Sequence, residues 1–422
     1  MKKIVILWVI FCFAATLPAD AQFWKKKEKP APRKKNVVAR PKEPTKEAPK
    51  KKTREISYPK SITKERYRID VLLPLYLDDI VKNDKIETNE RLPEKAQSGI
   101  HFYQGLKLAA DSLSQSGYQV DVYVHDIAQK DSTPEALIQS QILATSDLII
   151  GAVSSYQIAP LANYAKKRKI NFVSVLSPAD GGVTDNPYFT IAQPTLITYI
   201  KKMRATVVKK YNDKPILLLY RTYPSVDSTA YQYVYENTES KFTPLLINQF
   251  PQGFRPEELL DSTRVNAIVM PIIDYAFAQS VLDYLQKYYS NYRFEIFGLP
   301  SWRSIAKIRK SGEYANIEVN YSAPFYYNAS SEHAQILAKK YREVFGGRLN
   351  EMNVRGYETL MIYATYLKLF GTIFNDKINE LPNTLSTYKI LPQWTEDNDL
   401  LYFENTHFAT YRYNDGSYSV TE

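Results

Sequence analysis

The sequence of 422 residues has little cysteine and little histidine. It contains one cysteine, Cys12, and four histidines, at positions 101, 125, 333 and 407. A single cysteine cannot close a disulfide within the chain, and a thiolate metal site needs several. The histidines show no metal-ligand spacing, and no G-x-S-x-G, Walker or H-E-x-x-H pattern occurs. We therefore expect no metal, no cofactor and no catalytic residues, and the protein is predicted not to be an enzyme.

Long apolar runs are also scarce. The longest spans residues 4–15, follows Lys2 and Lys3, and precedes small residues at positions 19–21. This is the pattern of a secretory signal peptide, with cleavage expected before Gln22. The run is shorter than the roughly 18 to 20 residues that a transmembrane helix needs, and the residues before Cys12 do not resemble a lipidation signal. Residues 1–21 thus predict export to the periplasm without a membrane span or a lipid anchor.

The net positive charge of the chain comes from one segment. The chain has 55 basic and 45 acidic residues, of which 19 basic and 6 acidic lie in residues 1–66, so the remainder has a net charge of −3. Binding of nucleic acid is disfavoured, because a basic surface normally belongs to the fold. Residues 22–66 are rich in Lys, Pro and Glu and predict a disordered tether. The tether is interpreted as a solvated spacer or as an electrostatic contact with an anionic envelope surface.

Strands and helices alternate from residue 67 onward. Apolar strand patterns at 67–76, 118–126, 147–153 and 170–177 are separated by helical patterns at 101–117, 132–144 and 156–169. Strands that alternate with single helices predict a parallel sheet with both faces covered.

A second alternating set begins after Pro194. The folded length of about 355 residues suits two lobes better than one. The predicted fold class is α/β, with two doubly wound parallel-sheet lobes. Lobe 1 is assigned to residues 67–193 plus 325–380. Lobe 2 is assigned to 194–324 plus 381–422, including a C-terminal hairpin around an Asn-Asp-Gly turn.

Serines follow two neighbouring predicted strands of lobe 1. Ser154 and Ser155 come after the third strand, and Ser177 comes after the fourth. Open α/β sheets bind ligands at the carboxyl ends of their strands, where helix N-termini offer free backbone amides. The serines therefore predict a site for a carboxylate or another acceptor-rich group. The alternative is that they only cap helices.

His125 and Asp126 end the second predicted strand. No third partner of a catalytic triad lies near them in the sequence. The pair is interpreted as a strand-end pair that faces a cleft or solvent.

The order of these elements resembles a known family. The stretches HFYQGLKLAADSLSQSG, VDVYVHD, DLIIGAVSSYQIAPLANYAKKRKINFVSVLSPAD and NVRGYETLMIYATYLK are similar to type I periplasmic solute-binding proteins of the leucine/isoleucine/valine-binding class. The resemblance runs over nearly all of residues 67–422. It implies two lobes joined by a three-crossover hinge, which close on a ligand.

The resemblance also implies a set of ligand-binding residues. In lobe 1 they correspond to Ser154, Ser155, Ser177 and Ala179. In lobe 2 they correspond to Tyr223, Asp274, Tyr275 and Trp302.

One departure concerns the ligand. Amino-acid binders of the family place an acidic residue for the ligand's ammonium in the loop that here reads FGLPSWRS, which has none. Asp274 is the candidate to replace it. The aromatic residues Tyr275 and Trp302 instead suit a sugar or an aromatic group.

Two functional classes follow from these observations. The first is a periplasmic receptor for a small polar ligand, either amino acid-like or sugar-like, that serves an ABC importer through its permease. The second is an envelope regulator that acts on a peptidoglycan synthase through protein contacts, which the basic tether favours.

Overall fold

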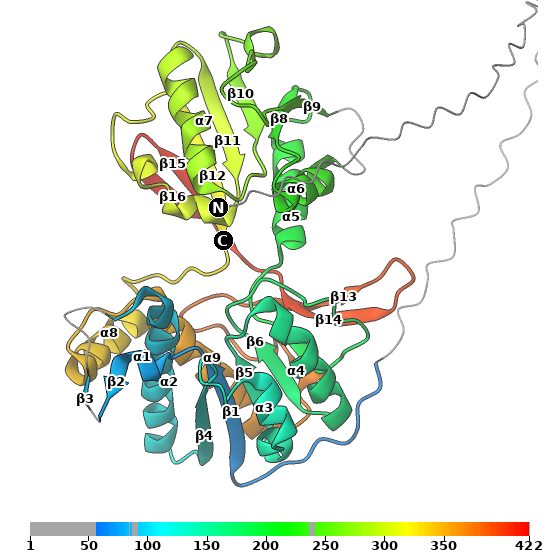
Figure 1. Ribbon diagram of the computed structural model, residues 1–422, viewed down its shortest axis with the longest axis vertical. Coiled ribbons are helices and arrows are strands. Elements are labelled where there is room, and N and C mark those ends of the chain that lie inside the picture. The colour runs from blue at the N-terminus through cyan, green and yellow to red at the C-terminus, as the bar shows by residue number, and fades with distance from the viewer. Residues whose placement is uncertain (1–55, 84, 87–91, 236–240, 422) are drawn as a thin grey trace, which may run out of the picture. The chain divides into compact units, whose positions relative to one another are not determined.

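The computed structural model of the protein describes residues 56–83, 85–86, 92–235 and 241–421. These residues form two seven-stranded sheets, each with its own helices (Figure 1). The predicted signal peptide at 1–21 and residues 22–55 of the predicted tether lie outside the described residues. None of the helices in the described part of the chain is long and apolar enough to cross a membrane.

The first sheet defines lobe 1 and has the strand order β13-β14-β7-β6-β5-β1-β4. Its strands pair in parallel except for β13, which runs antiparallel to β14. The central strands are buried almost throughout, as expected for a parallel sheet with two covered faces. The strands are β1 (Tyr67–Leu73), β4 (Val120–Asp126), β5 (Leu148–Gly151), β6 (Asn171–Ser174), β7 (Phe189–Ile191), β13 (Ile390–Trp394) and β14 (Leu400–Asn405).

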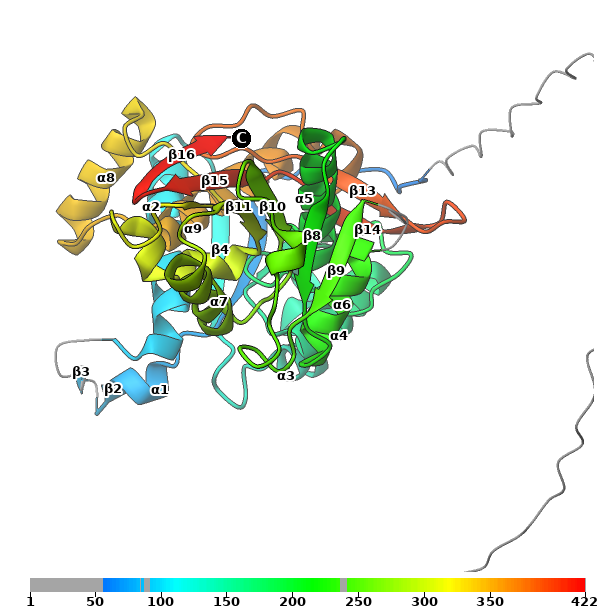
Figure 2. The ribbon, with the colours of Figure 1, turned by 90° about the horizontal axis from the view of Figure 1, so that it is seen from above.

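Helices cover both faces of this sheet (Figure 2). Val71 of β1 belongs to the apolar cluster that includes residues of α2 and α9, and its neighbour Leu72 belongs to the cluster beneath α3 and α4. This alternation follows from the two-residue period of a strand. The remaining elements of lobe 1 are α1 (Leu77–Ile80), β2 (Val81–Lys82), β3 (Lys85–Ile86), α2 (Glu94–Gln115), α3 (Pro134–Gln139), η1 (Ile142–Thr145), α4 (Ser155–Arg168), α8 (Glu332–Phe345), α9 (Glu351–Phe370) and η5 (Asn375–Lys377).

Two glycines allow α2 and α9 to pack backbone against backbone. A Cβ atom on Gly105 of α2 would lie 1.9 Å from the Asn353 carbonyl oxygen of α9, and one on Gly356 of α9 would lie 2.1 Å from the Phe102 carbonyl oxygen of α2. Phe102, Leu106 and Leu360 fill the same interface and are buried. Helix α2, which contains most of the helix expected at residues 101–117, therefore belongs to the core of lobe 1.

We expect Gly105→Ala to lower the free energy of unfolding by about 3 kcal/mol, the upper part of the range for overpacking, because the added methyl meets backbone that cannot rotate away. Gly347→Ala is the matched control, since its nearest neighbour would lie at an ordinary 3.6 Å. Denaturant unfolding measures both changes. Equal stabilities of the two variants would show that the helices do not approach as described.

The second sheet defines lobe 2 and has the order β16-β15-β12-β11-β10-β8-β9. Strands β8 to β12 are parallel, whereas β15 pairs antiparallel with both β12 and β16. One large apolar cluster joins this sheet to its helices. The elements are α5 (Leu196–Lys210), β8 (Ile216–Tyr220), α6 (Ser225–Tyr235), β9 (Phe242–Leu246), η2 (Glu257–Leu259), β10 (Val265–Val269), α7 (Tyr275–Tyr288), β11 (Arg293–Gly298), η3 (Pro300–Ser304), η4 (Ala306–Arg309), β12 (Ile317–Ala323), β15 (Ala409–Asn414) and β16 (Ser417–Thr421).

The chain passes between the lobes three times. It leaves lobe 1 after β7, returns after β12, and leaves again after β14, through residues 192–195, 324–331 and 406–408. The predicted fold class, two parallel-sheet lobes joined by three crossovers, is confirmed.

The lobe boundaries differ from the expected ones at residues 381–422. The expected C-terminal hairpin forms in lobe 2, where β15 and β16 meet at a turn with positive φ at Asp415 and Gly416. Strands β13 and β14, however, extend the sheet of lobe 1, with Phe403 opposite Thr190 of β7. The apolar side chains of this hairpin pack on one another, and nothing in their pattern specifies which sheet they join.

The end of the predicted tether also differs from a free chain. The Ser61 hydroxyl donates to the Phe370 carbonyl at 2.6 Å, and Ile62 exchanges hydrogen bonds with Thr372. Lys64 forms an ion pair with Asp147 at 2.6 Å. Ser61 and Ile62 are therefore fixed to lobe 1 at the end of α9, and Lys64 is fixed to it beside β5, although the composition of this segment is that of a linker.

Candidate functional site

The loops after β5 and β6 lie side by side, because the two strands pair in parallel with Gly151 opposite Ser174. The backbone amide of Ser154 donates to the Gln157 side chain at 3.1 Å. Ser155 is the first residue of α4 and is exposed. Its amide is one of those at a helix N-terminus that have no acceptor within the helix. Ser155 thus remains available to an acceptor-rich ligand, whereas the Ser154 amide is used within the protein.

Ser177 and Ala179 form a local turn after β6. The Ser177 hydroxyl accepts a hydrogen bond from the Ala179 amide at 3.3 Å. Arg355 of α9 anchors the start of this loop. Its guanidinium donates to the Val175 carbonyl at 2.9 Å and to the Gln193 side chain at 3.0 Å. The structure therefore brings the four predicted residues of lobe 1 to neighbouring loops.

Three of the four predicted residues of lobe 2, Tyr223, Asp274 and Tyr275, follow β8 and β10, which also pair in parallel. Tyr223 is 80% exposed and Tyr275 is 46% exposed. Asp274 caps α7, where its carboxylate accepts hydrogen bonds from the Ala276 and Phe277 amides, both at 3.0 Å. The Asp274 carboxylate, which was predicted to replace the missing acidic residue, therefore caps the N-terminus of α7.

A buried ion pair ties these two loops together. Asp227 of α6 is 1% exposed and accepts hydrogen bonds from Arg221 and, at 2.9 Å, from the Ile273 amide. The Arg221 guanidinium also lies 4.0 Å from the centroid of the Phe277 ring and 3.8 Å from the Asp274 carboxylate. Asp227 therefore fixes the loop that carries Tyr223 to the loop that carries Asp274 and Tyr275. Neither Arg221 nor Asp227 was singled out from the sequence.

Trp302 does not join this site. Its side chain is fully buried in the core of lobe 2, and its indole nitrogen donates to the Ile272 carbonyl at 2.9 Å. The ring also lies against Gly298, where a Cβ atom would approach it to 2.2 Å. The interpretation of Trp302 as a ligand-stacking residue is wrong, because its side chain points from η3 into the core of lobe 2 and is not exposed to a ligand.

Another exposed tyrosine takes a comparable place. Tyr156, the second residue of α4, is 74% exposed next to Ser155. With Tyr223 and Tyr275, it gives each lobe an exposed aromatic ring where strands give way to helix N-termini. Its place in the stretch GAVSSYQ, directly after the serines, is the signal that sequence reasoning overlooked.

His125 and Asp126 act separately, because successive residues of a strand point to opposite faces. The Asp126 carboxylate accepts hydrogen bonds from the amides of Leu75, Tyr76 and Leu77 at 2.8 to 3.1 Å and so shapes the loop after β1. The Nε2 atom of His125 lies 2.8 Å from the Asp70 carboxylate. The two side chains do not form a dyad.

Asp70 is the centre of a buried network on the same lobe. Its fully buried carboxylate accepts hydrogen bonds from Arg68 at 2.8 and 2.9 Å and from Ser146 at 2.6 Å, in addition to its contact with His125. Burial opposes ionisation, but these hydrogen bonds outweigh it and hold the pKa of Asp70 below its ordinary value of 3.8. The network stabilises the edge of the first sheet.

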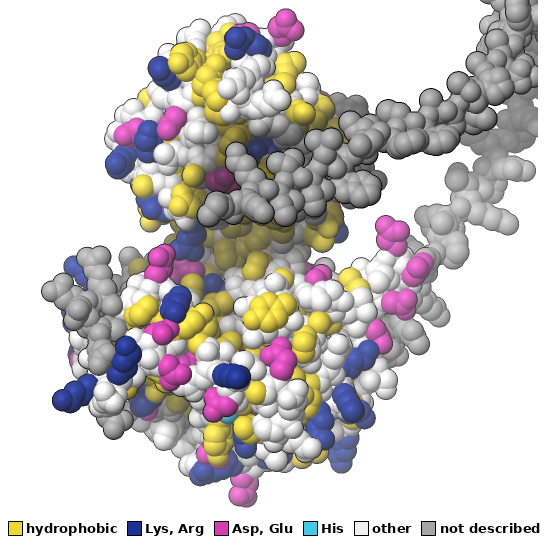
Figure 3. All heavy atoms as spheres, in the orientation of Figure 1, with side chains coloured by type: hydrophobic (Ala, Val, Ile, Leu, Met, Phe, Trp, Pro, Cys, Tyr) yellow, Lys and Arg dark blue, Asp and Glu magenta, His cyan; other side chains and the backbone are white. Residues whose placement is uncertain are grey.

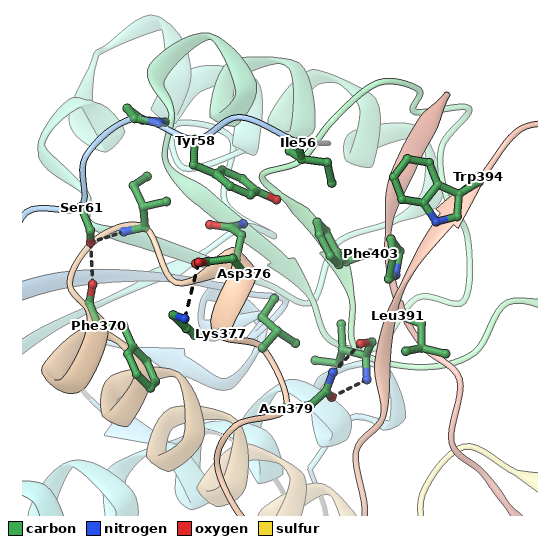
Figure 4. Close-up of a pocket in the computed structure, with 16 residues that line it drawn as sticks. Ile56, Tyr58, Ser61, Phe370, Asp376, Lys377, Asn379, Leu391, Trp394 and Phe403 are labelled. Atoms are coloured by element: carbon green, nitrogen blue, oxygen red, sulfur yellow. Dashed lines mark hydrogen bonds and ion pairs between the residues drawn. The ribbon is translucent and has the colours of Figure 1, made fainter. Parts of the chain in front are cut away.

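A cavity of about 1050 Å³ lies elsewhere on lobe 1 (Figure 4). Tyr58, Trp394 and Phe403 line it together with residues around η5. The Tyr58 hydroxyl and the Asn375 side-chain oxygen are buried there without a hydrogen-bond partner among the described residues. The predicted ligand-binding residues do not line this cavity.

The described residues contain no cluster of three or more His, Cys, Asp or Glu side chains placed to hold a metal ion. Acidic and basic side chains are interspersed over the face of lobe 1 that Figure 3 shows. This distribution matches the small negative charge of residues 67–422 and differs from the uniformly basic surface of a nucleic-acid-binding fold.

Comparison with known proteins finds similar folds among solved structures only. No family model and no curated protein matches the sequence. Among solved structures, the chain is similar to a branched-chain amino acid ABC transporter periplasmic ligand-binding protein of Burkholderia xenovorans, with a TM-score of 0.56, 14% identity, and coverage of 84% of this chain and 94% of that one. It is similar to an ABC transporter substrate-binding protein of Desulfitobacterium hafniense, with a TM-score of 0.54, 12% identity, and coverage of 85% and 100%. It is also similar to an ABC transporter substrate-binding protein of Sphaerobacter thermophilus, with a TM-score of 0.53, 14% identity, and coverage of 84% of this chain and 96% of that one.

These similarities show the fold. The chain has the type I periplasmic-binding-protein fold, as the resemblance of its sequence implied.

Proposed function

We propose that the protein is a non-enzymatic periplasmic receptor that binds a small polar ligand between its two lobes and delivers it to an ABC importer. The observation that supports this proposal most strongly is the equivalence of the two lobes. Each presents neighbouring loops at the carboxyl ends of parallel strands, with an exposed helix N-terminus and at least one exposed tyrosine. This is where α/β sheets bind ligands.

The chemistry of these loops defines the ligand class. Ser155 and the amides at the start of α4 suit a carboxylate or another acceptor-rich group. Tyr156, Tyr223 and Tyr275 suit the flat face of a sugar or an aromatic group. The Asp274 side chain is 50% exposed, but its carboxylate already accepts hydrogen bonds from two backbone amides. This disfavours an α-amino acid ligand, whose ammonium would need that carboxylate. A ligand with a polar head and a flat ring fits best.

We expect Ser155→Ala to weaken ligand binding by about 1 to 2 kcal/mol, which is typical for one hydrogen bond to a charged group. The melting temperature should barely change, because Ser155 lies inside the first turn and does not cap it. Titration calorimetry with the co-purifying ligand measures the loss, and Ser140→Ala, at the exposed residue that follows α3, is the control. Unchanged affinity with a lower melting temperature would assign Ser155 a structural role only.

A second candidate function is regulation of a peptidoglycan synthase by a protein held at the envelope. The basic composition of the segment before residue 56 favours it, since residues 25–54 contain 14 basic and 3 acidic residues. Such a segment is attracted to anionic phospholipid or cell wall, and salt screens the attraction over about 8 Å at physiological strength.

For an envelope-held protein, deletion of residues 25–54 should abolish co-sedimentation with anionic liposomes or cell walls at low salt. The deletion stops at 54 because Ser61 and Lys64 are bonded to lobe 1. A variant of full length in which Ser replaces the basic residues of 25–54 separates charge from length. Equal sedimentation of all three proteins, or sedimentation indifferent to salt, would exclude the adhesive role.

A further inference from the structure

Among the described residues, the two large sheets have four edge strands, and three of these carry features that discourage pairing with another chain. Strand β13 contains Pro392 and β9 contains Pro244. On β4, Asp121 binds Arg66 of the preceding segment at 2.9 Å. Proline and charge are the usual means by which natural sheets block their edges.

The fourth edge, β16, carries neither feature. Its sequence is Ser-Tyr-Ser-Val-Thr, without charge and without proline. It pairs with β15 on one side and ends the strand order on the other (Figure 2). All its residues are exposed except Val420, which is half-buried, and Tyr418 is 62% exposed. No strand in the described part of the chain pairs with the outer side of β16, so the backbone groups on that side are accessible to another chain.

A stack of tyrosines leads to this edge. Tyr321 of β12 stacks on Tyr411 of β15 with centroids 5.5 Å apart, and Tyr413 of β15 stacks on Tyr418 with centroids 5.4 Å apart. The rings stand on one face of the sheet because each pair is directly opposite in register. The stack ends on Tyr418, so the outermost ring lies at the open side of the sheet.

We propose that β16 pairs antiparallel with β16 of a second copy of this chain, about a two-fold axis at Ser419. The pairing would join the second sheets of two molecules and continue their hydrogen-bond ladders across the axis. It is an interaction surface distinct from the ligand site and does not depend on the receptor function.

The register of this pairing is the argument for a second copy. With the axis at Ser419, Tyr418 faces the partner subunit's Val420, and Ser417 faces the partner subunit's Thr421. Aromatic with β-branched and hydroxyl with hydroxyl are favourable cross-strand pairs. The same two kinds of pair already exist inside the molecule, where Tyr411 faces Val420 and Thr410 faces Thr421. A strand that is complementary to β15 in this way is complementary to itself.

No side chain of β16 itself is charged, so no like charges face each other among the five paired residues. The neighbouring Arg412 is bound to Glu318 at 2.6 Å, and Asp415 at the turn accepts a hydrogen bond from the Ser311 hydroxyl at 3.1 Å. The closed, two-fold form of the contact is the commonest symmetry of soluble oligomers. Because only five residues pair, the interface is small, and we expect association in the micromolar range or weaker.

Site-directed cross-linking tests the register. In a Cys12→Ser background the introduced thiol is the only cysteine of the chain. In the Ser419→Cys variant the two introduced thiols face each other at the axis, and we expect oxidation to a disulfide-linked dimer. In the Ser417→Cys variant each thiol faces the partner subunit's Thr421, so we expect about ten-fold less cross-linked dimer. The reason is that a disulfide tolerates Cα separations only up to about 7 Å. Equal or absent cross-linking of the two variants would overturn the proposed register.

Sedimentation velocity of the full chain, over a concentration series up to about 500 µM, tests the association itself. Tyr418→Lys places a charge on the edge and should weaken dimerisation by at least about ten-fold. Leu246→Lys places the same charge on the exposed position of β9 and should leave dimerisation unchanged. A monomer at every concentration, or equal weakening by both variants, would overturn the proposal, and circular dichroism confirms that both variants are folded.

Discussion

Asp227→Ala is expected to lower the free energy of unfolding by about 3 to 5 kcal/mol, because it removes the buried counter-charge of the Arg221 guanidinium and leaves that group with the half-exposed Asp274 carboxylate at 3.8 Å. The Arg221 side chain is 10% exposed, so water cannot replace the lost carboxylate. The Ile273 amide loses its acceptor at the same time. Denaturant unfolding of the variant and the wild type measures the loss.

The matched control is Asp111→Ala. Asp111 pairs with Lys107 one helical turn away, and both side chains are at least one-third exposed. Exposed pairs of this kind contribute about 0.5 kcal/mol or less. If Asp227→Ala cost no more than Asp111→Ala, the buried ion pair would not be formed.

The same substitution also separates the lobes' contributions to binding. Since Asp227 fixes the loops of Tyr223 and Asp274, its removal should weaken ligand affinity even where the protein remains folded. The Ser155 side of the site should be unaffected, because it belongs to lobe 1.

Asp70→Asn is expected to cost about 3 to 5 kcal/mol at pH 7, and the cost should shrink in acid. The pKa of Asp70 is lowered in the folded state, so its ionised form binds Arg68, Ser146 and His125 and stabilises the fold at every pH above the unfolded value of 3.8. As pH falls from there through the folded pKa, the carboxylate takes up a proton and the stabilisation is lost.

The measurement is the difference in unfolding free energy between wild type and Asp70→Asn from pH 2 to pH 7. Taking the difference removes the opposite contribution of Glu358 and Glu404, whose pKa values are raised by burial. A difference that stayed constant below pH 4 would contradict a lowered pKa of Asp70.

The alternation of the chain sufficed to predict the two sheets. Parallel strands buried on both faces need continuous apolar runs, and helices between them need a one-sided apolar pattern, so both signals are strong. The assignment of segment 381–405 to lobe 2 is wrong, because the sequence of a short hairpin does not indicate which sheet the hairpin extends. The contacts of residues 61–64 were hidden for a different reason, since they rest on hydroxyl and backbone groups within a linker-like composition.

The position of the candidate site could be predicted better than its members. Strand ends locate loops, and Ser155, Tyr223 and Tyr275 are indeed exposed there. Whether an aromatic side chain turns outward or inward depends on the space above the sheet, and Trp302 fills that space. Asp227 and Arg355 look like ordinary charged residues of a helix, and only the fold shows that they hold the loops in place.

Native mass spectrometry of the full-length chain, purified from the periplasm without denaturation, tests the central claim most directly. A receptor should carry a small molecule that adds a discrete mass, is lost on unfolding, and rebinds when the refolded chain is incubated with a small-molecule extract. Tyr156→Ala combined with Tyr223→Ala should reduce the bound fraction. A chain that shows only its bare mass, both when freshly purified and after incubation with the extract, would contradict the receptor function.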